Sequence, residues 1–245
     1  MKLDILLPCY KPHANWEKNI IEAVSNLQKS IGALGEIHLY ITNDGAPDQY
    51  YDENVLKEIS DAVNGRFYFL KYEKNRGKGY SLRHLVKNAT GDLIVYTDGD
   101  FPFGWEAVAD AFKMLADGSD VIMGRRNRSY GEALTPFRKC LSGGLKLLNQ
   151  LLCGLPGDIQ DTQAGMKGFN RKGREAFLMT TVNTFVFDTE FILLAWNRRL
   201  KITPVDVELR PGLKLSSMGL KVLFRELLCF ARVLWRVRIR KCYKK

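Results

Sequence analysis

The chain has 245 residues, of which 46% are hydrophobic and 26% are charged, and this balance excludes an intrinsically disordered protein. Its length is sufficient for one large domain with a substantial core. The net charge of +10 is concentrated near the C-terminus, where residues 221–245 contain nine Lys or Arg residues and one acidic residue. The first 220 residues carry only +2. The positive charge is therefore informative about the binding partners of the tail and not about those of the rest of the chain.

The cysteines and the N-terminus both favour a cytosolic protein. Five cysteines are scattered without a C-x-x-C pair, and the three histidines lack the spacing of a zinc site. This usage favours reduced thiols over a disulfide framework. The N-terminus enters an apolar strand at once, so no signal peptide is expected. No run of about 18 uncharged apolar residues occurs, so we expect no membrane-spanning helix.

Short β-rich runs alternate with helical patterns along the first half of the chain. We expect strands at Leu3–Pro8, Ile37–Asn43, Phe67–Tyr72, Leu93–Thr97 and Val121–Met123. We expect helices at Trp16–Ile31, Gln49–Val63, Tyr80–Asn88 and Gly104–Leu115. This alternation predicts an α/β fold in which helices cover both faces of a mostly parallel sheet. Ligands bind such sheets beyond the carboxyl ends of the strands, so polar residues at those ends are the first candidates for a site.

The second half of the chain continues the domain and then changes character. We expect a helix at Pro136–Leu152, a loop at Gly154–Gly157, a helix at Asp188–Arg199 and a strand at Ile202–Leu209. No repeat or long linker interrupts this part, so residues 1–217 are expected to form one domain. Residues 218–245 are expected to form a basic tail, because apolar residues recur there at helical spacing and alternate with Lys and Arg.

Two interpretations of this tail stay open. A basic amphipathic helix that carries Phe224 and Trp235 can lie in a membrane interface, where its cations meet anionic lipid headgroups. The same helix can instead pack on the domain and turn a basic face to solvent. Nucleic acid is not expected as a partner, because no recognition motif accompanies the charge.

Asp98-Gly99-Asp100 directly follows an apolar strand and is the leading candidate for chemistry. Two carboxylates two residues apart can share a hard divalent cation, Mg²⁺ or Mn²⁺, which also takes diphosphate oxygens. With 15 Asp residues in the chain, about one Asp-x-Asp pair is expected by chance. Its place at a strand end is therefore the informative feature, and a solvated turn is the alternative.

Two further strand ends carry residues suited to a nucleotide. Residues 75–79, Asn-Arg-Gly-Lys-Gly, can bring backbone amides and an ammonium group close to a phosphate, although they do not form a P-loop. Asp44 can accept hydrogen bonds from a base or a ribose. The respective alternatives are a flexible basic turn and an Asp-Gly turn.

Taken in order, six motifs resemble the family 2 glycosyltransferases, and most of all the dolichyl-phosphate and polyprenyl-phosphate sugar transferases. The motifs are Leu-Pro-Cys-Tyr from residue 7, Asn-Asp-Gly from 43, Asn-Arg-Gly-Lys-Gly from 75, Thr-Asp-Gly-Asp from 97, Gly-Arg-Arg from 124 and Asp-Thr-Gln-Ala-Gly-Met-Lys-Gly-Phe from 161. The match runs from about Leu3 to Leu215. The resemblance implies the GT-A fold, with a Rossmann-like sheet, and a transfer that inverts the anomeric carbon of the sugar.

The resemblance also implies a role for each matching residue. Nucleotide-sugar binding falls to Pro8, Tyr10, Asp44, Lys78, Asp98 and Gln163. The implied metal ligands are Asp98 and Asp100, and the implied catalytic residues are Asp98 and Asp161. The residues placed for a phosphate of the acceptor or donor are Arg126, Arg210 and Lys214. Mannosyltransferases of this group can use a glutamine two residues after the second Asp, and this chain has Pro102 there.

The nature of the acceptor decides whether a base is needed. A lipid phosphate is already anionic and needs little general-base help, whereas a hydroxyl acceptor needs a carboxylate base. Asp161 is the first candidate for such a base, or for a residue that orients the nucleophile. Asp188 and Glu190 follow it, because acidic residues at the start of a helix can equally serve the helix dipole.

We therefore expect an inverting glycosyltransferase that moves a sugar from a nucleotide-diphosphate sugar to a polyprenyl phosphate. A UDP-sugar is favoured as donor, with GDP-mannose as the alternative, and the protein is expected to be peripheral on the cytoplasmic face of the membrane. One alternative is a transferase that extends a surface glycan or a lipid-linked oligosaccharide at a hydroxyl. The other is a non-catalytic adaptor that binds nucleotide sugars at a membrane, against which the retained Asp98, Asp100, Asp161 and Lys78 argue.

Overall fold

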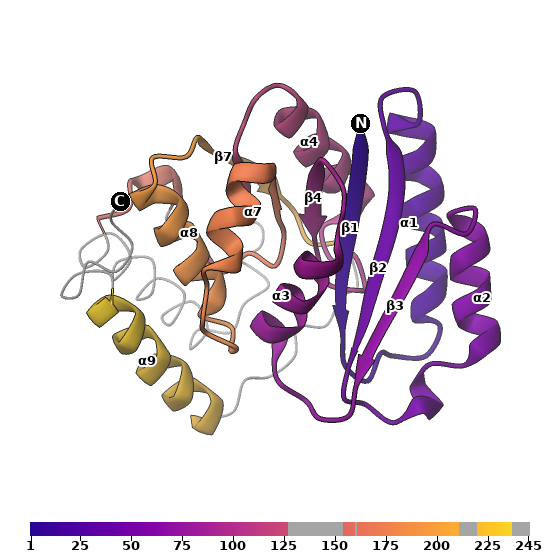
Figure 1. Cartoon of the computed structure of the whole chain (residues 1–245), viewed down its shortest axis with the longest axis horizontal. Coiled ribbons are helices and arrows are strands. Elements are labelled where there is room, and N and C mark those ends of the chain that lie inside the picture. Colours follow the sequence, from indigo (N-terminus) through magenta and orange to yellow (C-terminus); the bar gives the residue numbers. More distant parts are fainter. Residues whose placement is uncertain (127–153, 160, 211–219, 237–245) are drawn as a thin grey trace.

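A mostly parallel sheet runs through the centre of the molecule (Figure 1). The computed structural model describes residues 1–126, 154–159, 161–210 and 220–236, so the helix expected at Pro136–Leu152 and the candidate Lys214 lie outside the described residues. Within them the sheet has seven strands in the order β3-β2-β1-β4-β6-β5-β7. These are β1 Lys2–Cys9, β2 Glu36–Asp44, β3 Phe67–Tyr72, β4 Leu93–Tyr96, β5 Val121–Arg126, β6 Lys167–Phe169 and β7 Ile202–Val207.

Strand β1 lies where the order of the strands reverses. It pairs in parallel with β2 on one side and with β4 on the other, and β3 continues beyond β2. Open α/β sheets bind ligands at this kind of reversal, beyond the carboxyl ends of the strands. Strand β6 departs from the expected pattern, because it runs antiparallel to both β4 and β5. Its three residues are too few to show a strand periodicity in the sequence.

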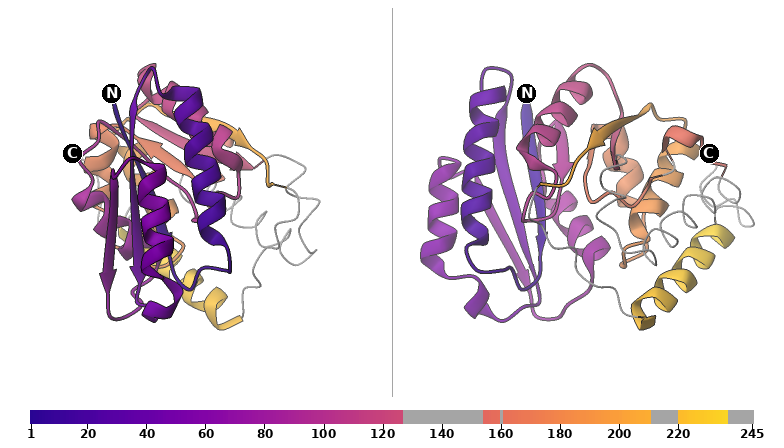
Figure 2. Two further views of the ribbon diagram at one scale, coloured as in Figure 1. Left: turned by 90° about the vertical axis from the view of Figure 1, so that its right-hand side faces the viewer. Right: turned by 180° about the vertical axis from the view of Figure 1, so that it is seen from behind.

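Helices cover both faces of the sheet, as the alternation of elements predicts (Figures 1 and 2). Side chains of β1 point alternately to two separate cores, because Ile5 and Leu7 enter one core while Leu6 enters the other. Helices α1, α2 and α4 contribute to the first core, and α3, α7, α8 and α9 to the second. These helices are α1 Trp16–Ile31, α2 Glu53–Ala62, α3 Lys78–Asn88, α4 Gly104–Ala116, α7 Arg171–Leu178, α8 Phe187–Asn197 and α9 Leu220–Leu234.

Side-chain caps explain the start of α2 and the presence of α7, both of which differ from the expectation. The helix expected at Gln49–Val63 begins only at Glu53, because the Asp52 carboxylate accepts a hydrogen bond of 2.8 Å from the backbone amide of Asn54. A short 3₁₀ turn, Asp48–Tyr50, precedes it. Helix α7 is not anticipated by the sequence pattern, and its cap is Asn170, whose side-chain oxygen accepts from the amides of Lys172 and Gly173.

Helix α9 lies within the expected basic tail and packs on the domain through one side. Phe230 and Val233 are buried in the second core. Leu227 and Leu228 on the helix and Trp235 directly after its end are exposed by 48%, 53% and 55%. Across the part of the chain that the structure describes, no helix combines the length and apolar character needed to cross a membrane.

Candidate active site

A cavity of about 390 Å³ lies beyond the carboxyl ends of β1 and β2. Four residues to which the motifs assign nucleotide binding line it together: Pro8, Tyr10, Asp44 and Lys78. Its volume falls within the range of small-molecule sites. The remaining lining residues are Cys9, Asn75, Arg76, Gly77, Thr184, Phe185 and Arg225.

Asp44 holds the loop that forms one wall of this cavity. Its two carboxylate oxygens accept hydrogen bonds from the backbone amides of Arg76, at 2.8 Å, and Gly77, at 3.0 Å. Asp44 is buried, with 4% of its surface exposed. Each carboxylate oxygen has a second lone pair, so Asp44 can position the loop and still accept a hydrogen bond from a ligand.

The start of helix α3 faces the same cavity. Gly77 and Lys78 stand at its first turn, where the helix dipole favours an anion. The amides of Gly77 and Gly79 are already engaged by Asp44 and by the carbonyl oxygen of Asn183. Gly77 has φ of +90°, and a Cβ there would lie 2.6 Å from the carbonyl oxygen of Asn183. A side chain at this position is therefore excluded by both conformation and space. A Cβ at Gly79 would lie 2.4 Å from the carbonyl oxygen of Val182, so the close approach of residues 182–183 explains both glycines.

Lys78 connects the cavity to the Asp98-Gly99-Asp100 segment. Its ammonium forms an ion pair with Oδ1 of Asp98. Burial lowers the pKa of Lys78, but the attraction of Asp98 and Asp188 is stronger, so that the pKa lies above its ordinary value. The side chain of Asp98 stays 42% exposed. Lys78 is therefore a cation in the folded protein, placed between the cavity and the acidic segment.

Gly165 fits against the other oxygen of Asp98. A Cβ at Gly165 would lie 2.7 Å from Oδ2 of Asp98 and 3.6 Å from Nζ of Lys78. The 161–169 motif thus reaches the acidic segment directly, and its glycine is required for that approach. Gly99 has the same character, because a Cβ there would lie 2.8 Å from Sγ of Cys9. Burial and the charges of Asp98 and Asp100 raise the pKa of the Cys9 thiol to about 12, so this cysteine is a neutral packing residue.

Arg210 joins the acidic segment from the end of β7. Its guanidinium donates a hydrogen bond of 2.6 Å to the carbonyl oxygen of Asp100, and its backbone amide donates to the carbonyl oxygen of Pro102. Burial and the charge of Asp98 raise the pKa of Asp100, while Arg210 opposes that rise. Two like charges thus meet at this strand end, and the cations Lys78 and Arg210 lie close to them.

Asp98 and Asp100 fit a divalent cation by their donor chemistry. Burial is the largest cause of the raised pKa of Asp100, and the charge of Asp98 adds to it; a bound cation would offset the repulsion between the two carboxylates. Among the described residues, no group of three or more His, Cys, Asp or Glu side chains is placed to hold a metal. Mg²⁺ is commonly held by one or two carboxylates together with phosphates of the substrate. Two carboxylates are therefore a sufficient protein contribution, and Pro102 supplies none.

Asp161, the first candidate for a general base, is held by Arg126. The guanidinium and the backbone amide of Arg126 donate to both carboxylate oxygens of Asp161, and only 3% of the Asp161 side chain is exposed. An ion pair of this kind keeps the carboxylate charged and fixed in orientation. The arrangement favours an orienting role for Asp161 over proton abstraction.

Lys167 fixes the loop that carries Asp161, Gln163 and Gly165. It is fully buried, and its ammonium donates to the carbonyl oxygens of Thr162 and Ala164 and lies 3.1 Å from Oδ1 of Asp188. Burial lowers the pKa of Lys167, and Asp188 acts against this effect. Gln163 donates to the Thr189 hydroxyl at 2.9 Å, so that the loop is also tied to helix α8.

The two other candidate bases are engaged as well. The carboxylate of Asp188 accepts from the Tyr96 hydroxyl in addition to its contact with Lys167. Glu190 accepts from the backbone amides of Thr181 and Val182 at 2.7 and 2.8 Å. Both residues therefore hold neighbouring segments in place. Their role thus goes beyond complementing the helix dipole.

Several residues of the site are not singled out by the sequence. The cavity is also lined by Thr184, Phe185 and Arg225. These residues are far along the chain from the strand ends, and no motif includes them. Lys167 belongs to the matched 161–169 motif, but its full burial becomes visible only in the structure. The motif could have drawn attention to Lys167. The three cavity residues could not be predicted from the sequence, because only tertiary packing brings them to the cavity.

The model of the family described as Glycosyl transferase family 2 matches residues 4–175. This match covers more than half of the chain, and the chain belongs to that family. The resemblance drawn from the six motifs is confirmed, and with it the expectation of a sugar transferase.

Relatives carry the names of the subgroup that the motifs most resemble. A dolichyl-phosphate beta-glucosyltransferase of Trichomonas vaginalis is 26% identical over 261 residues, which cover 98% of this chain and 77% of the relative. The enzyme of that name from Saccharomyces cerevisiae is 26% identical over 84% of this chain and 66% of its own length. A dolichol-phosphate mannosyltransferase of Pyrococcus furiosus is 24% identical over 67% of this chain and 45% of its own length. The chain thus spans only part of each relative.

Solved structures share the fold. Glucosyl-3-phosphoglycerate synthase from Mycobacterium tuberculosis, crystallised with Mn²⁺, UDP and glucosyl-3-phosphoglycerate, has a TM-score of 0.67 at 16% identity, covering 96% of this chain and 78% of that chain. Mannosyl-3-phosphoglycerate synthase from Rubrobacter xylanophilus has a TM-score of 0.66 at 15% identity, covering 98% and 74%. These likenesses confirm the expected GT-A fold.

Proposed function

We propose that this chain transfers a sugar from a nucleotide-diphosphate sugar to a polyprenyl phosphate, with inversion at the anomeric carbon. One observation carries the proposal: Lys78 lines the nucleotide-sized cavity and pairs with Asp98, so the cavity and the acidic segment form one continuous site. The names of the relatives support the acceptor class.

The donor would lie across this continuous site. Pro8, Tyr10 and Asp44 would contact the nucleoside in the cavity, and the start of α3 with Lys78 would face the diphosphate. Gln163 would lie on the side of the transferred sugar, because its loop reaches Asp98 through Gly165. A UDP-sugar is the proposed donor, since solved neighbours were crystallised with UDP, and GDP-mannose is the alternative.

Asp98 and Asp100 would hold Mg²⁺ or Mn²⁺ together with the diphosphate of the donor. When bound, the cation neutralises the charge that builds on the departing nucleoside diphosphate. Lys78 adds a second positive charge on the cavity side of Asp98. Neighbours of the same fold were crystallised with Mn²⁺ or Mg²⁺, which supports this choice of cation.

The occupied carboxylates favour an acceptor that is already ionised. Asp161, Asp188 and Glu190 each accept hydrogen bonds from fixed donors, so none is poised as a free general base. A phosphate nucleophile needs no base, whereas a hydroxyl does. Asp161 would instead orient Arg126 towards the reacting groups.

Arg210 is the proposed contact for the acceptor phosphate. Its Nε is buried and has no hydrogen-bond partner among the described residues, although its terminal nitrogen donates to Asp100. A buried donor without a partner is costly, and a phosphate oxygen of a ligand would satisfy it. Arg126 and Lys214 are proposed as further contacts to the acceptor phosphate.

The exposed apolar side of α9 is the proposed contact with the membrane. Leu227, Leu228 and Trp235 can enter the interface, while the basic residues of the tail meet anionic headgroups. A lipid-linked acceptor requires such a contact, because its phosphate stays at the bilayer surface. The protein would then act as a peripheral enzyme on the cytoplasmic face.

The acceptor class is tested with two lipids that differ in one group. The protein is incubated with Mn²⁺, a labelled UDP-sugar or GDP-mannose, and either polyprenyl phosphate or the matching polyprenol. We expect an acid-labile labelled lipid with polyprenyl phosphate and none with polyprenol. A product with polyprenol alone would support the hydroxyl alternative, and no product with any donor would contradict the proposed transfer.

A further inference from the structure

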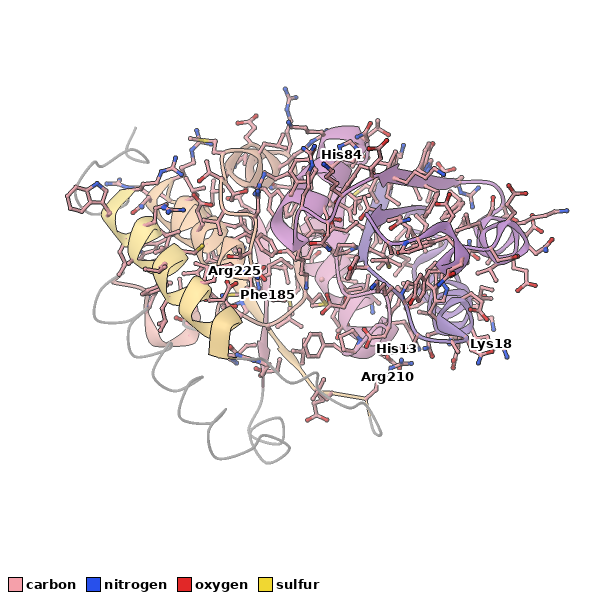
Figure 3. All side chains as sticks on the ribbon, turned by 90° about the horizontal axis from the view of Figure 1, so that it is seen from below. His13, Lys18, His84, Phe185, Arg210 and Arg225 are labelled. Atoms are coloured by element: carbon pink, nitrogen blue, oxygen red, sulfur yellow. The ribbon has the colours of Figure 1, made fainter. Side chains whose placement is uncertain are left out.

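Helix α9 reaches the wall of the candidate donor cavity. Arg225, near the start of the helix, lines the cavity together with Thr184 and Phe185. Figure 3 shows Arg225 and Phe185 next to each other. The basic tail is therefore not only a surface for lipid, because one of its cations belongs to the site.

Arg225 is held in this position by the residue that follows it. Oε2 of Glu226 accepts a hydrogen bond of 3.1 Å from the backbone amide of Val186, and Glu226 is buried with 8% of its surface exposed. Glu226 thus ties α9 to Val186, while its neighbour Arg225 lines the cavity together with Phe185. Buried Phe230 anchors the following turn of the helix.

The segment that carries Val186 also contacts helix α3 at its start. The amide of Gly79 donates to the carbonyl oxygen of Asn183 at 2.9 Å, and Arg83 donates to the carbonyl oxygen of Val182 at 2.7 Å. Contacts therefore run without a break from α9, through residues 182–186, to the start of α3. The position of Arg225 relative to Lys78 is fixed by packed elements.

The charge of Arg225 is available to a ligand. Its side chain is 59% exposed, and its ion pair with Glu226 is long, at 3.6 Å. Glu226 is itself engaged by Val186, and Lys78 is paired with Asp98. Arg76 also lines the cavity, but its guanidinium lies over the Tyr80 ring and donates to the Tyr80 hydroxyl. A guanidinium that lines the same cavity as a helix start is suited to a phosphate, which it can bind with two parallel hydrogen bonds.

We propose that Arg225 binds a phosphate group of a ligand in this cavity, and that α9 is therefore a structural part of the substrate site. This inference rests on the proposed donor site and extends it to the tail. The phosphate belongs to the diphosphate of the nucleotide donor or to the lipid acceptor. Because both ligands present the same chemistry to a guanidinium, the experiment separates them.

The test compares Arg225→Gln and Arg225→Lys in the full chain with Arg232→Gln. Arg232 lies two turns further along α9, is exposed, and does not line the cavity. Dissociation constants are measured by calorimetry for UDP and for uridine in the presence of Mn²⁺, with GDP and guanosine as a second pair. The Michaelis constant for polyprenyl phosphate is then measured at saturating donor. Thermal unfolding of each variant checks that the fold is intact.

We expect Arg225→Gln to weaken binding of the nucleoside diphosphate about tenfold and to leave binding of the nucleoside unchanged, as loss of one charge-assisted contact predicts. Arg225→Lys keeps part of the affinity, and Arg232→Gln keeps all of it. An unchanged affinity for the diphosphate together with an about tenfold higher Michaelis constant for polyprenyl phosphate would assign the phosphate to the acceptor.

Two results would overturn the inference. One is an Arg225→Gln variant that matches the wild type in both measurements, and the other is a variant that loses nucleoside and diphosphate binding equally. In either case, transfer by the wild type would leave the proposed function standing. A wild-type chain that binds neither nucleoside diphosphate would contradict the donor site itself, and Arg225 with it.

Discussion

Lys78 and Asp98 form an ion pair between two different structural units, the start of α3 and the segment that follows β4. Gly165 lies against the other oxygen of the same carboxylate. Three motifs that are far apart in the sequence therefore meet at one side chain. Their contacts explain the lysine, the aspartate and the glycine at these three positions. No motif taken alone shows these contacts.

Gly165→Ala tests whether close packing against Asp98 matters for activity. The added Cβ would lie 2.7 Å from Oδ2 of Asp98, so that either the carboxylate or the loop must shift. A misplacement of this size at reacting groups predicts a fall in kcat of about 10- to 100-fold. Steady-state transfer kinetics measure it.

Gly118→Ala is the matched control for this change. Gly118 has φ of +92° and nothing within 4 Å of the added Cβ, so the substitution strains the backbone away from the site. It should lower the free energy of unfolding by about 1 kcal/mol and leave kcat unchanged. A wild-type kcat for Gly165→Ala would contradict the packing of Gly165 on Asp98.

Lys167→Met tests the buried cation beneath the site. The substitution leaves Asp188 without its ion pair and two backbone carbonyls without a donor, which predicts a loss of about 3–5 kcal/mol in the free energy of unfolding. Lys172→Met serves as the control, because Lys172 is 70% exposed and pairs with Asp120 at the surface. Its expected loss is below about 1 kcal/mol. Urea unfolding measures both, and similar losses for the two variants would refute the role of Lys167.

Asp4 predicts a particular dependence of stability on pH. It is fully buried, and its carboxylate accepts from the amides of Thr90 and Gly91 at 2.7 and 2.6 Å. Burial raises the pKa of Asp4 above its ordinary value of 3.8, although these hydrogen bonds lower it in part. The folded state thus binds the proton more readily than the unfolded state. Stability from this group therefore increases as the pH falls through the raised pKa towards 3.8.

The comparison with Asp4→Asn isolates that contribution. The difference in free energy of unfolding, wild type minus variant, should rise as the pH falls below neutrality and level off near the unfolded pKa. Urea unfolding of both proteins at a series of pH values measures it. A difference that shrinks as the pH falls would mean that the pKa of Asp4 is lowered instead.

The exposed side of α9 is tested by substitution and not by truncation. Phe230 and Val233 are buried in the second core, so removal of the helix would damage the domain as well as any membrane contact. Replacing Leu227, Leu228 and Trp235 with Ser removes only exposed apolar surface. We expect vesicle binding to fall about tenfold or more.

Flotation with vesicles of mixed anionic and neutral phospholipids measures this binding. Leu34→Ser is the control, because Leu34 is 54% exposed and follows α1, which packs on the opposite face of the sheet. Equal flotation of the triple variant and the wild type would refute the membrane contact through α9.

Much of the fold follows from the sequence, because apolar strands and amphipathic helices alternate with clear periodicity. The strand ends with Pro8, Asp44 and Asp98 are found for the same reason, since chain order and strand direction place them at one edge. Strand β6 is missed because three residues show no period, and its antiparallel direction depends on its neighbours.

The partners of charged residues could not be predicted from the sequence. The sequence leaves Asp161 open as a general base or as a residue that orients the nucleophile, and its ion pair with Arg126, 35 residues away, appears only in the structure. From the sequence, Arg225 is one of several basic residues of the tail, and helical spacing does not predict which element each of them contacts. The structure places it at the cavity. Such pairs form between segments that are distant in the sequence, and no sequence periodicity predicts them.

The most direct test of the site is the rate of sugar transfer to polyprenyl phosphate by Asp98→Asn, compared with Asp110→Asn. Asp110 is an exposed carboxylate on α4 that pairs only weakly with Lys113, at 3.9 Å. If Asp98 is a metal ligand as proposed, its loss predicts a rate lower by about 100-fold or more, on the order of 3 kcal/mol, at saturating Mn²⁺. Asp110→Asn should match the wild type. A transfer rate for Asp98→Asn within about twofold of the wild type would contradict a metal-assisted donor site at Asp98.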